Sequence, residues 1–300
     1  MKDEIRNRIT SMLRGEALFD EPMARHASLR AGGPADCFAI PADVDDLRCL
    51  VKFLGESGIP YLPVGGCCNL LVRDGGFRGT IISLEGLNRI SYAGANILEA
   101  GSGVENRQLA QFTLENDLSG LEFLIGIPGR LGGALAMNAG AGGHAVTDSL
   151  ETLRTLLNGT VTLKRKEDVE HGYRFLNLAP GEIIVGASFR LERESREVIS
   201  AKIEGFLDHR RNTQQVGFPS AGSFFRNPAG KPAWRLIEEA GLRGYRIGGA
   251  QVSEVHANFL VNRGGAKAAD FIRLASHIKQ EVKKRTDITL EEEVKIVGTD

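Results

Sequence analysis

The sequence contains no apolar run long enough to span a membrane and no excess of charge of either sign. Its 37 lysine and arginine residues nearly balance 38 aspartate and glutamate residues, which argues against a general role in binding nucleic acid or membrane surfaces. The charged N-terminus, residues 1–14, lacks the apolar stretch of a signal peptide. We therefore expect a cytoplasmic protein that binds any anionic ligand in a local pocket.

Cysteine is scarce, and its placement indicates no metal site. The four cysteines, Cys37, Cys49, Cys67 and Cys68, do not have the spacing of metal ligands. A disulfide between adjacent residues such as the last two is strained and rare. We expect reduced thiols and no bound metal.

Hydrophobic residues make up 42% of the 300 residues, which is enough for a large core and more than a single core usually organises. Apolar periodicity and turn residues predict an α+β protein of two or three domains. The expected helices are 43–58 with Asp43 as N-cap, one that begins at Ser195, 232–240 and 267–285. The expected strands are 59–64, 80–84, 97–100, 161–164, 183–191 with alternate residues on one face, and 289–297. The polar stretch 192–197 suggests a linker or helix start, and we place a domain boundary after residue 194.

Two segments, 64–71 and 126–140, concentrate glycine. Successive N–H groups in tight turns bind anions, and only glycine adopts the necessary positive φ angles without cost. Two such loops suggest a ligand as large as a dinucleotide. The Gly101-Ser102-Gly103 stretch that follows a predicted strand is an incomplete Rossmann fingerprint, because Asn106 occupies the place of the third glycine. Individual structural turns remain an alternative explanation for these glycines.

The stretch P-S-A-G-S-F-F-R-N-P, residues 219–228, is the best candidate for catalysis. Ser223 follows a glycine that permits close approach of a substrate, and it precedes two phenylalanines that can exclude water. Its hydroxyl could donate a proton, and Arg226 and Asn227 could help to hold an anionic substrate. The residues alone are equally compatible with a buried turn whose serine is satisfied internally.

Six separated motifs occur together in one order: 30–36, 64–72, 126–140, Tyr173-Arg174, the Ser223 loop and 290–294. Together they resemble the UDP-N-acetylenolpyruvoylglucosamine reductase family, whose members are also called UDP-N-acetylmuramate dehydrogenases. The resemblance covers roughly residues 20–298, and the compact region around 244–250 is similar to the shorter subtype of that family.

The resemblance implies an α+β fold that combines an FAD-binding domain of the vanillyl-alcohol-oxidase type with a smaller α+β substrate-binding domain. We expect residues 1–194 to form the FAD-binding region, with subdomains of about 20–75 and 76–194. Residues 195–288 would form the substrate domain, and the strand 289–298 would pack back on the FAD-binding region.

The resemblance also implies a reaction. NADPH would reduce non-covalently bound FAD, and the flavin would pass hydride to the enolpyruvyl group of a UDP-sugar, giving UDP-N-acetylmuramate for peptidoglycan synthesis and cell wall biogenesis. Arg174 would polarise the substrate carboxylate, Ser223 would donate the proton, and Glu293 would assist at the carboxylate or in the proton network. Without the resemblance, Arg174 would be taken for a surface residue and Glu293 for part of a solvated run of glutamates.

Further residues are carried over from the same motifs. The expected cofactor contacts are Gly65, Gly66, Cys67, Cys68, Asn69, Leu70, Gly126, Ile127, Gly129, Gly132, Gly133 and Asn138. The expected substrate contacts are Tyr173, Arg211, Asn227, Gln251, His256 and Asn258, although each could instead be an ordinary turn, helix-end or core residue. We expect a monomer or a weak dimer and no nucleic-acid partner.

The sequence departs from the family pattern at two places. Cys67 and Cys68 replace a common Gly-Ser pair, and Gly142 replaces an aromatic residue. Two other functions remain open: a flavin oxidase of the same fold, and a non-catalytic binder of nucleotide sugars. Residues 65–69 contain no histidine, which excludes a covalent flavin link there.

Overall fold

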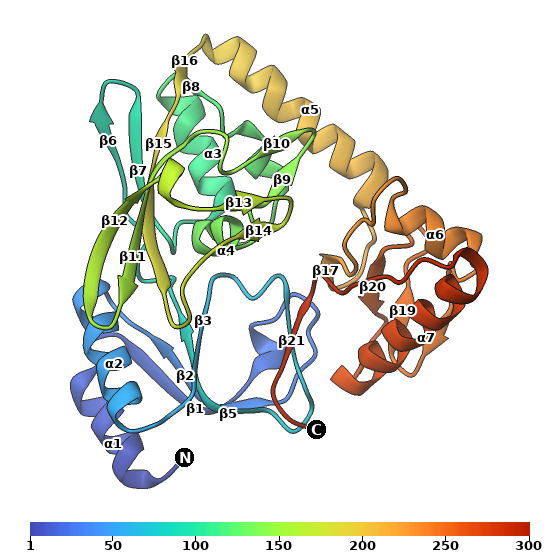
Figure 1. The fold of residues 1–300 in the computed structure, drawn as a ribbon, viewed down its shortest axis with the longest axis horizontal. Helices are drawn as coiled ribbons and strands as arrows, with labels where there is room; N and C mark the ends of the chain where they lie inside the picture. Colours follow the sequence, from blue (N-terminus) through green and yellow to red (C-terminus); the bar gives the residue numbers. More distant parts are fainter. The chain divides into compact units, whose positions relative to one another are not determined.

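The computed structural model describes all 300 residues, and the chain divides into two compact units (Figure 1). Unit 1 consists of Met1–Phe19, Cys37–Gly66 and Gly79–Arg210, and unit 2 consists of Asp20–Asp36, Cys67–Arg78 and Arg211–Asp300. This division differs from the boundary expected after residue 194, because the first fifteen residues of helix α5 (Arg196–Gln214) belong to unit 1. No helix in the structure is both long and apolar enough to cross a membrane.

A buried carboxylate fastens α5 to the rest of unit 1. Lys202 on this helix donates a hydrogen bond to Ser119 Oγ (2.8 Å), and its Nζ lies 3.6 Å from Glu122 Oε1. Ser119 and the backbone N–H of Gly120 both donate to the Glu122 carboxylate. Burial by itself raises the pKa of Glu122, but these hydrogen bonds and Lys202 hold that pKa below its usual value. The network explains why the helix does not start a new unit.

The first sheet has the strand order β1-β2-β5-β3, and two helices pack against it. The elements are β1 (Glu16–Pro22), β2 (Pro34–Ile40), β5 (Phe77–Ser83), β3 (Tyr61–Val64), α1 (Asp3–Met12) and α2 (Val44–Glu56). Asp43 caps α2 by accepting a hydrogen bond from Asp46 N (2.9 Å), which confirms the predicted N-cap. Leucines spaced three or four residues apart bury the inner face of this helix, as the sequence pattern predicts.

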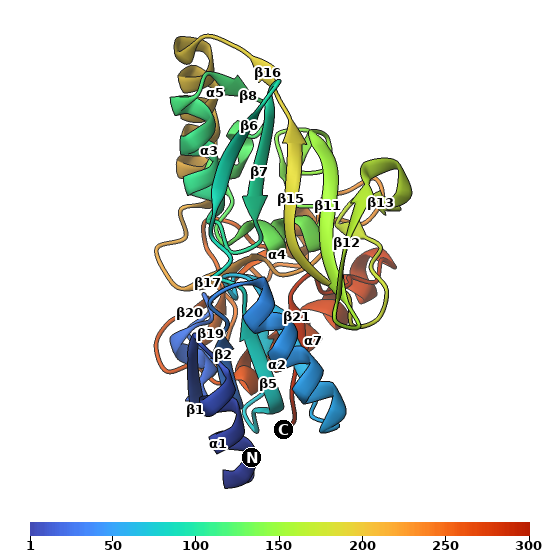
Figure 2. The same ribbon diagram turned by 90° about the vertical axis from the view of Figure 1, so that its left-hand side faces the viewer.

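The second sheet of unit 1 has the order β12-β11-β15-β7-β6, seen side by side in Figure 2. Its strands are β12 (Thr160–Arg165), β11 (Leu150–Leu157), β15 (Ile183–Arg190), β7 (Ile97–Gly101) and β6 (Ile90–Gly94), with α3 (Asn106–Glu115) and α4 (Leu131–Ala136) against one face. The expected alternation on one face of the stretch 183–191 holds for Ala187, Phe189 and Leu191, which share one core, and fails at Val185 beyond a shift in register. Ile184 packs in the core with α3 and α4, whereas Ile183 and Val185 pack in the core with α1 and α2, so the strand is buried on both faces.

Short pairs of strands extend from this framework in unit 1. They are β8 (Leu118–Ser119) with β16 (Glu192–Arg193), β9 (Gly140–Ala141) with β10 (His144–Ala145), and β13 (His171–Gly172) with β14 (Phe175–Leu176). Short 3-10 helices cover Met23–Arg25, Glu122–Gly126 and Lys166–Asp168. The β9–β10 and β13–β14 hairpins carry or contact residues of the candidate site.

Unit 2 is built on a sheet of order β17-β20-β19-β18 that shares one core with two helices. The elements are β17 (Ser220–Ser223), β20 (Phe259–Asn262), β19 (Ala250–Val252), β18 (Arg246–Ile247), α6 (Ala233–Glu239) and α7 (Ala268–Thr286). The expected helices 232–240 and 267–285 are thereby confirmed.

The predicted strand 289–297 is much shorter in the structure. Only β21 (Lys295–Val297) is a strand, and it pairs in parallel with β4 (Leu70–Val72) inside unit 2. Before it, Leu290 and Val294 are buried in the core of the unit, and an isolated bridge joins Glu292 to Phe225, so packing and single backbone contacts replace a regular ladder in this stretch.

Candidate functional site

The two glycine clusters approach each other closely in unit 1. A Cβ atom added to Gly65 would lie 3.3 Å from the backbone nitrogen of Gly133 and 3.4 Å from the Cβ of Arg130. A side chain at Gly65 would therefore need one of the loops to shift. Gly65 and Gly66 belong to this unit, whereas residues 67–70 belong to unit 2.

The turn after β7 holds the second glycine segment in place. Gly132 N donates to Ser102 O (2.8 Å), and a Cβ on Gly132 would lie 2.8 Å from Ser102 Cβ. Asn106 donates from its backbone to Gly129 O (3.0 Å) and from Nδ2 to Ile127 O (3.2 Å). The stretch that resembles an incomplete Rossmann fingerprint thus supports the glycine segment instead.

Two polar atoms in this region are buried without a hydrogen-bond partner: Ser102 Oγ and Asn106 Oδ1. Because buried polar atoms are nearly always paired, such atoms beside a glycine cradle fit a polar ligand. Arg130 is held beside them, since it donates to Gly103 O (2.7 Å) and pairs with Glu85 (2.7 Å). These side chains are not among the residues predicted from the sequence to bind a ligand, although a Ser-Gly pair after a strand is a recognisable signal.

Asn138, an expected cofactor contact, is 5% exposed and has its side chain engaged within the protein. Its Nδ2 donates to Gly172 O (2.8 Å), and its Oδ1 accepts from Thr147 Oγ1 (2.9 Å) and Thr147 N (3.3 Å). These bonds tie the start of the β9–β10 hairpin to the β13–β14 hairpin.

Arg174 and Tyr173 are the two turn residues of the β13–β14 hairpin, since Gly172 pairs with Phe175. Arg174 has a φ of +56°, a left-handed conformation that is uncommon outside glycine. Its Nη2 donates to Gly140 O (3.4 Å), and its guanidinium carbon lies 5.1 Å from the centre of the Tyr173 ring. The hairpin therefore holds this arginine in a defined conformation.

Ser223 ends β17 in unit 2 at an irregular point of the ladder. The register shifts between Ser220 and Ser223, and Gly222 between them has a φ of +78°. The Ser223 hydroxyl is half-buried and forms no hydrogen bond with another residue. A serine that is not satisfied internally fits the role of a donor to a substrate.

Asn258 holds the residues that follow Ser223. Its Nδ2 donates to Phe225 O (2.8 Å), its Oδ1 accepts from Phe225 N (3.0 Å), and its backbone carbonyl accepts from Phe224 N (2.7 Å). Both phenylalanines are fully buried, with ring centres 5.3 Å apart. Asn258 is itself only 1% exposed, so the structure gives this expected substrate contact a role in supporting the loop.

Glu293 lies beside the same loop within unit 2. Its backbone N–H donates to Phe224 O (2.8 Å), which places it next to the residue that follows Ser223. Its carbonyl accepts from Asn69 Nδ2 (2.9 Å). Two members of the expected catalytic trio are therefore adjacent through their backbones in one unit.

Other expected substrate contacts in unit 2 have local partners. Asn227 Oδ1 accepts from the first N–H of α6 (3.0 Å), and Gln251 Nε2 donates to Gly244 O (2.9 Å). Burial lowers the pKa of His256, so this histidine is neutral near pH 7, and its Nδ1 is buried without a partner. Arg211 lies exposed in the last turn of α5. Their contacts with a substrate stay predictions.

The two departures from the family pattern each have a local structural setting. Cys67 is buried and has a φ of +49°, the conformation that glycine adopts at no cost. At Gly142, an added Cβ would lie 2.8 Å from the ring of Phe206 on α5. The ring of Phe206 in turn packs edge-on against Phe123 and His144.

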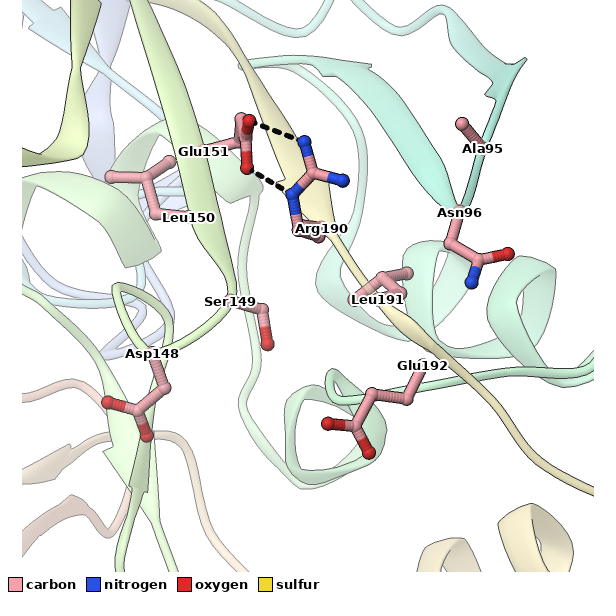
Figure 3. Close-up of a pocket in the computed structure, with 9 residues that line it drawn as sticks. All are labelled: Ala95, Asn96, Asp148, Ser149, Leu150, Glu151, Arg190, Leu191 and Glu192. Carbon is pink, nitrogen blue, oxygen red and sulfur yellow. Dashed lines mark hydrogen bonds and ion pairs between the residues drawn. The ribbon is translucent and has the colours of Figure 1, made fainter.

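A surface hollow of about 410 Å³ lies in unit 1 (Figure 3). It is lined by Ala95, Asn96, Asp148, Ser149, Leu150, Glu151, Arg190, Leu191 and Glu192. In this hollow, Arg190 donates two hydrogen bonds of 2.7 Å to Glu151, so the charges of these two residues are paired with each other. None of the expected site residues lines this hollow.

Comparison with known proteins covers both parts of the chain. Residues 35–164 match the model described as FAD binding domain, and residues 214–297 match that of the UDP-N-acetylenolpyruvoylglucosamine reductase C-terminal domain. The crystal structure of UDP-N-acetylenolpyruvylglucosamine reductase from Thermus caldophilus has a TM-score of 0.80 and 31% identity, covering 95% of this chain and 99% of that one. The expected two-domain α+β fold is thereby confirmed.

Curated relatives match over the full length. The UDP-N-acetylenolpyruvoylglucosamine reductase of Geobacter metallireducens is 59% identical over 298 residues, covering 99% of both chains. That of Geotalea uraniireducens is 57% identical over 300 residues, covering 100% of both. The chain belongs to the UDP-N-acetylenolpyruvoylglucosamine reductase family.

Proposed function

We propose that this protein is a flavoenzyme that reduces the enolpyruvyl ether of UDP-N-acetylglucosamine to UDP-N-acetylmuramate. NADPH supplies the electrons through non-covalently bound FAD, and the reaction is a cytoplasmic step of peptidoglycan precursor synthesis. The observation that carries this proposal is the 59% identity to a reductase of that name over 99% of both chains. Function diverges less often at such identity over a full chain than it does when only the fold is shared.

The glycine cradle of unit 1 fits the FAD diphosphate. Gly65 and Gly133 bring two backbone segments together without side chains between them, and the Ser102 hydroxyl provides an unpartnered donor beside them. Backbone N–H groups in such turns bind phosphate oxygens, so the loss of the usual Gly-Ser pair at Cys67 leaves this mode of binding intact. When bound, FAD supplies the two-electron chemistry that no side chain can perform.

The substrate needs a proton donor and a cation. Reduction of its double bond adds hydride to the terminal methylene carbon and a proton to the carbon that bears the carboxylate, on which negative charge builds. Ser223 donates this proton from its unpaired hydroxyl, and Arg174 stabilises the carboxylate. Glu293 completes the proton network beside Phe224.

An anaerobic assay tests the proposed reaction. Loss of NADPH absorbance beyond one equivalent of enzyme flavin is expected only when the UDP-enolpyruvyl sugar is present, with one NADPH consumed for each sugar. A flavin oxidase of the same fold has no oxygen to reoxidise its flavin in this assay, and the sugar would not restore turnover. Absence of sugar-dependent loss of NADPH absorbance would therefore refute the proposal.

Adjacent glycines in α4 allow a matched test of the cradle. Alanine at Gly133 adds a methyl group to open space, since no protein atom lies within 4 Å of the added Cβ. We expect Gly133→Ala to leave the stability of the flavin-free protein intact and to weaken FAD binding by about tenfold through a clash with the ligand. Titration of the flavin-free protein with FAD, followed by fluorescence, measures this.

Gly132→Ala is the contrasting variant. Its added Cβ meets Ser102 Cβ at 2.8 Å, so the protein itself should be destabilised. Unchanged FAD affinity in Gly133→Ala would mean that the cofactor does not occupy this side of the cradle.

A further inference from the structure

The stretch 291–295 in unit 2 is held by backbone hydrogen bonds to the loop that carries Ser223. Arg226 N donates to Glu291 O (2.9 Å), Phe225 forms an isolated bridge with Glu292, and Glu293 N donates to Phe224 O (2.8 Å). These contacts align the stretch beside the loop residue by residue.

Asn69 holds the same stretch through both its backbone and its side chain. Lys295 N donates to Asn69 O (3.0 Å), and Asn69 Nδ2 donates to Glu293 O (2.9 Å). The pairing continues into β4 and β21, where Leu70 lies opposite Lys295. The Asn69 side chain thus binds the Glu293 carbonyl, which lies outside the regular ladder of β4 and β21.

Both peptide groups of Glu293 are consequently fixed. Its N–H is bound to Phe224 and its carbonyl to the Asn69 amide, so the direction of its Cα–Cβ bond is set on both sides. The neighbouring Glu292 is directed elsewhere, because both of its carboxylate oxygens lie 3.0 Å from Lys279 Nζ. The Glu292 carboxylate is thus committed to pairing with Lys279 of α7.

We propose that Asn69 is a positioning residue that aims Glu293 for the proton-transfer step. This inference rests on the proposed function, in which Glu293 acts in the proton network. Asn69 directly follows the 65–68 loop, so the segment expected to bind the cofactor also sets the geometry of an acid in unit 2. From the sequence, Asn69 is expected only to contact the cofactor.

Aspartate at position 69 is the sharpest test, because it keeps the size of the side chain but cannot donate to the Glu293 carbonyl. In anaerobic stopped-flow measurements, Asn69→Asp should be reduced by NADPH within about twofold of the wild-type rate. Its reoxidation by the UDP-enolpyruvyl sugar should slow by about 10- to 100-fold, as expected for a misplaced catalytic group. If the aspartate variant folds poorly, Asn69→Ala, which also lacks the donor, replaces it in the same measurement.

Two further variants separate positioning from general disturbance. Asn177→Asp makes the same change at an exposed amide in unit 1 that contacts Glu170, and it should leave both half-reactions unchanged. Glu293→Gln alone should slow reoxidation, and adding Asn69→Asp to it should slow the reaction no further, since Asn69 acts through Glu293.

The outcomes distinguish the inference from the proposed function. If Asn69→Asp slows the Glu293→Gln enzyme by its full factor, or slows flavin reduction equally, Asn69 does not act through Glu293 and the inference fails while the reaction stands. If Glu293→Gln is reoxidised at the wild-type rate, the role of Glu293 fails and the inference with it. If the wild-type flavin is not reoxidised by the sugar at all, the proposed function is wrong.

Discussion

Replacing Ser223 with alanine is expected to leave reduction of the flavin by NADPH unchanged and to slow its reoxidation by the UDP-enolpyruvyl sugar by a factor of about 10²–10⁴. This corresponds to about 2.7–5.5 kcal/mol of lost transition-state stabilisation. The hydroxyl has no partner in the protein, so its removal breaks no internal hydrogen bond and should not destabilise the fold. Anaerobic stopped-flow spectroscopy of the flavin separates the two half-reactions.

Two variants sharpen the result for Ser223. Ser223→Cys restores a weaker donor at the same place and should recover part of the rate. Ser276→Ala removes an exposed hydroxyl from α7 in the same unit and should behave like the wild-type enzyme. Reoxidation of Ser223→Ala at the wild-type rate would exclude this serine as the proton donor.

Replacing Asn258 with alanine is expected to destabilise unit 2 by about 2–4 kcal/mol. The substitution leaves the N–H and the carbonyl of Phe225 without their partners in a site that is almost fully buried. It also opens a small cavity beside two buried aromatic rings. Chemical denaturation followed by circular dichroism measures the loss in free energy of unfolding.

Asn258→Asp tests the cause of that loss. The carboxylate can still accept from Phe225 N but cannot donate to Phe225 O, and a charge would be buried beside that carbonyl. It should therefore remain destabilising, whereas Asn177→Ala at an exposed site should change stability by no more than about 0.5 kcal/mol. An Asn258→Ala protein of normal stability with a raised KM for the sugar would instead support the role of a substrate contact.

Helices and most strands could be predicted from the local sequence pattern, because neighbouring residues determine their apolar faces and caps. Asp43 with the leucines of α2 is the clearest case. The failures have physical causes that lie elsewhere in the chain. Strand β15 is buried on both faces because two separate cores meet it. The stretch 289–294 is not a regular strand, because it is fixed by the core packing of Leu290 and Val294 and by backbone bonds to the distant Ser223 loop.

The residue types of the candidate site could be predicted from the sequence, but the hydrogen-bond partners of these residues could not. Glycine clusters and an unusual serine loop can be recognised in the sequence. The supporting bonds from Asn69 to Glu293 and from Asn258 to Phe225 join residues 224 and 33 positions apart. No local sequence pattern predicts bonds over such separations. Four amides expected to contact ligands, at Asn69, Asn138, Asn227 and Asn258, form hydrogen bonds with the protein backbone that the sequence did not predict.

Phe206 and Gly142 compete for the same space. A Cβ atom at position 142 would lie 2.8 Å from the Phe206 ring, so any side chain there requires this ring to move. The ring of Phe206 supplies the aromatic contact with Phe123 and His144 from a position 64 residues further along the chain. The two positions are therefore physically coupled: a larger residue in the hairpin displaces the ring that joins α5 to it.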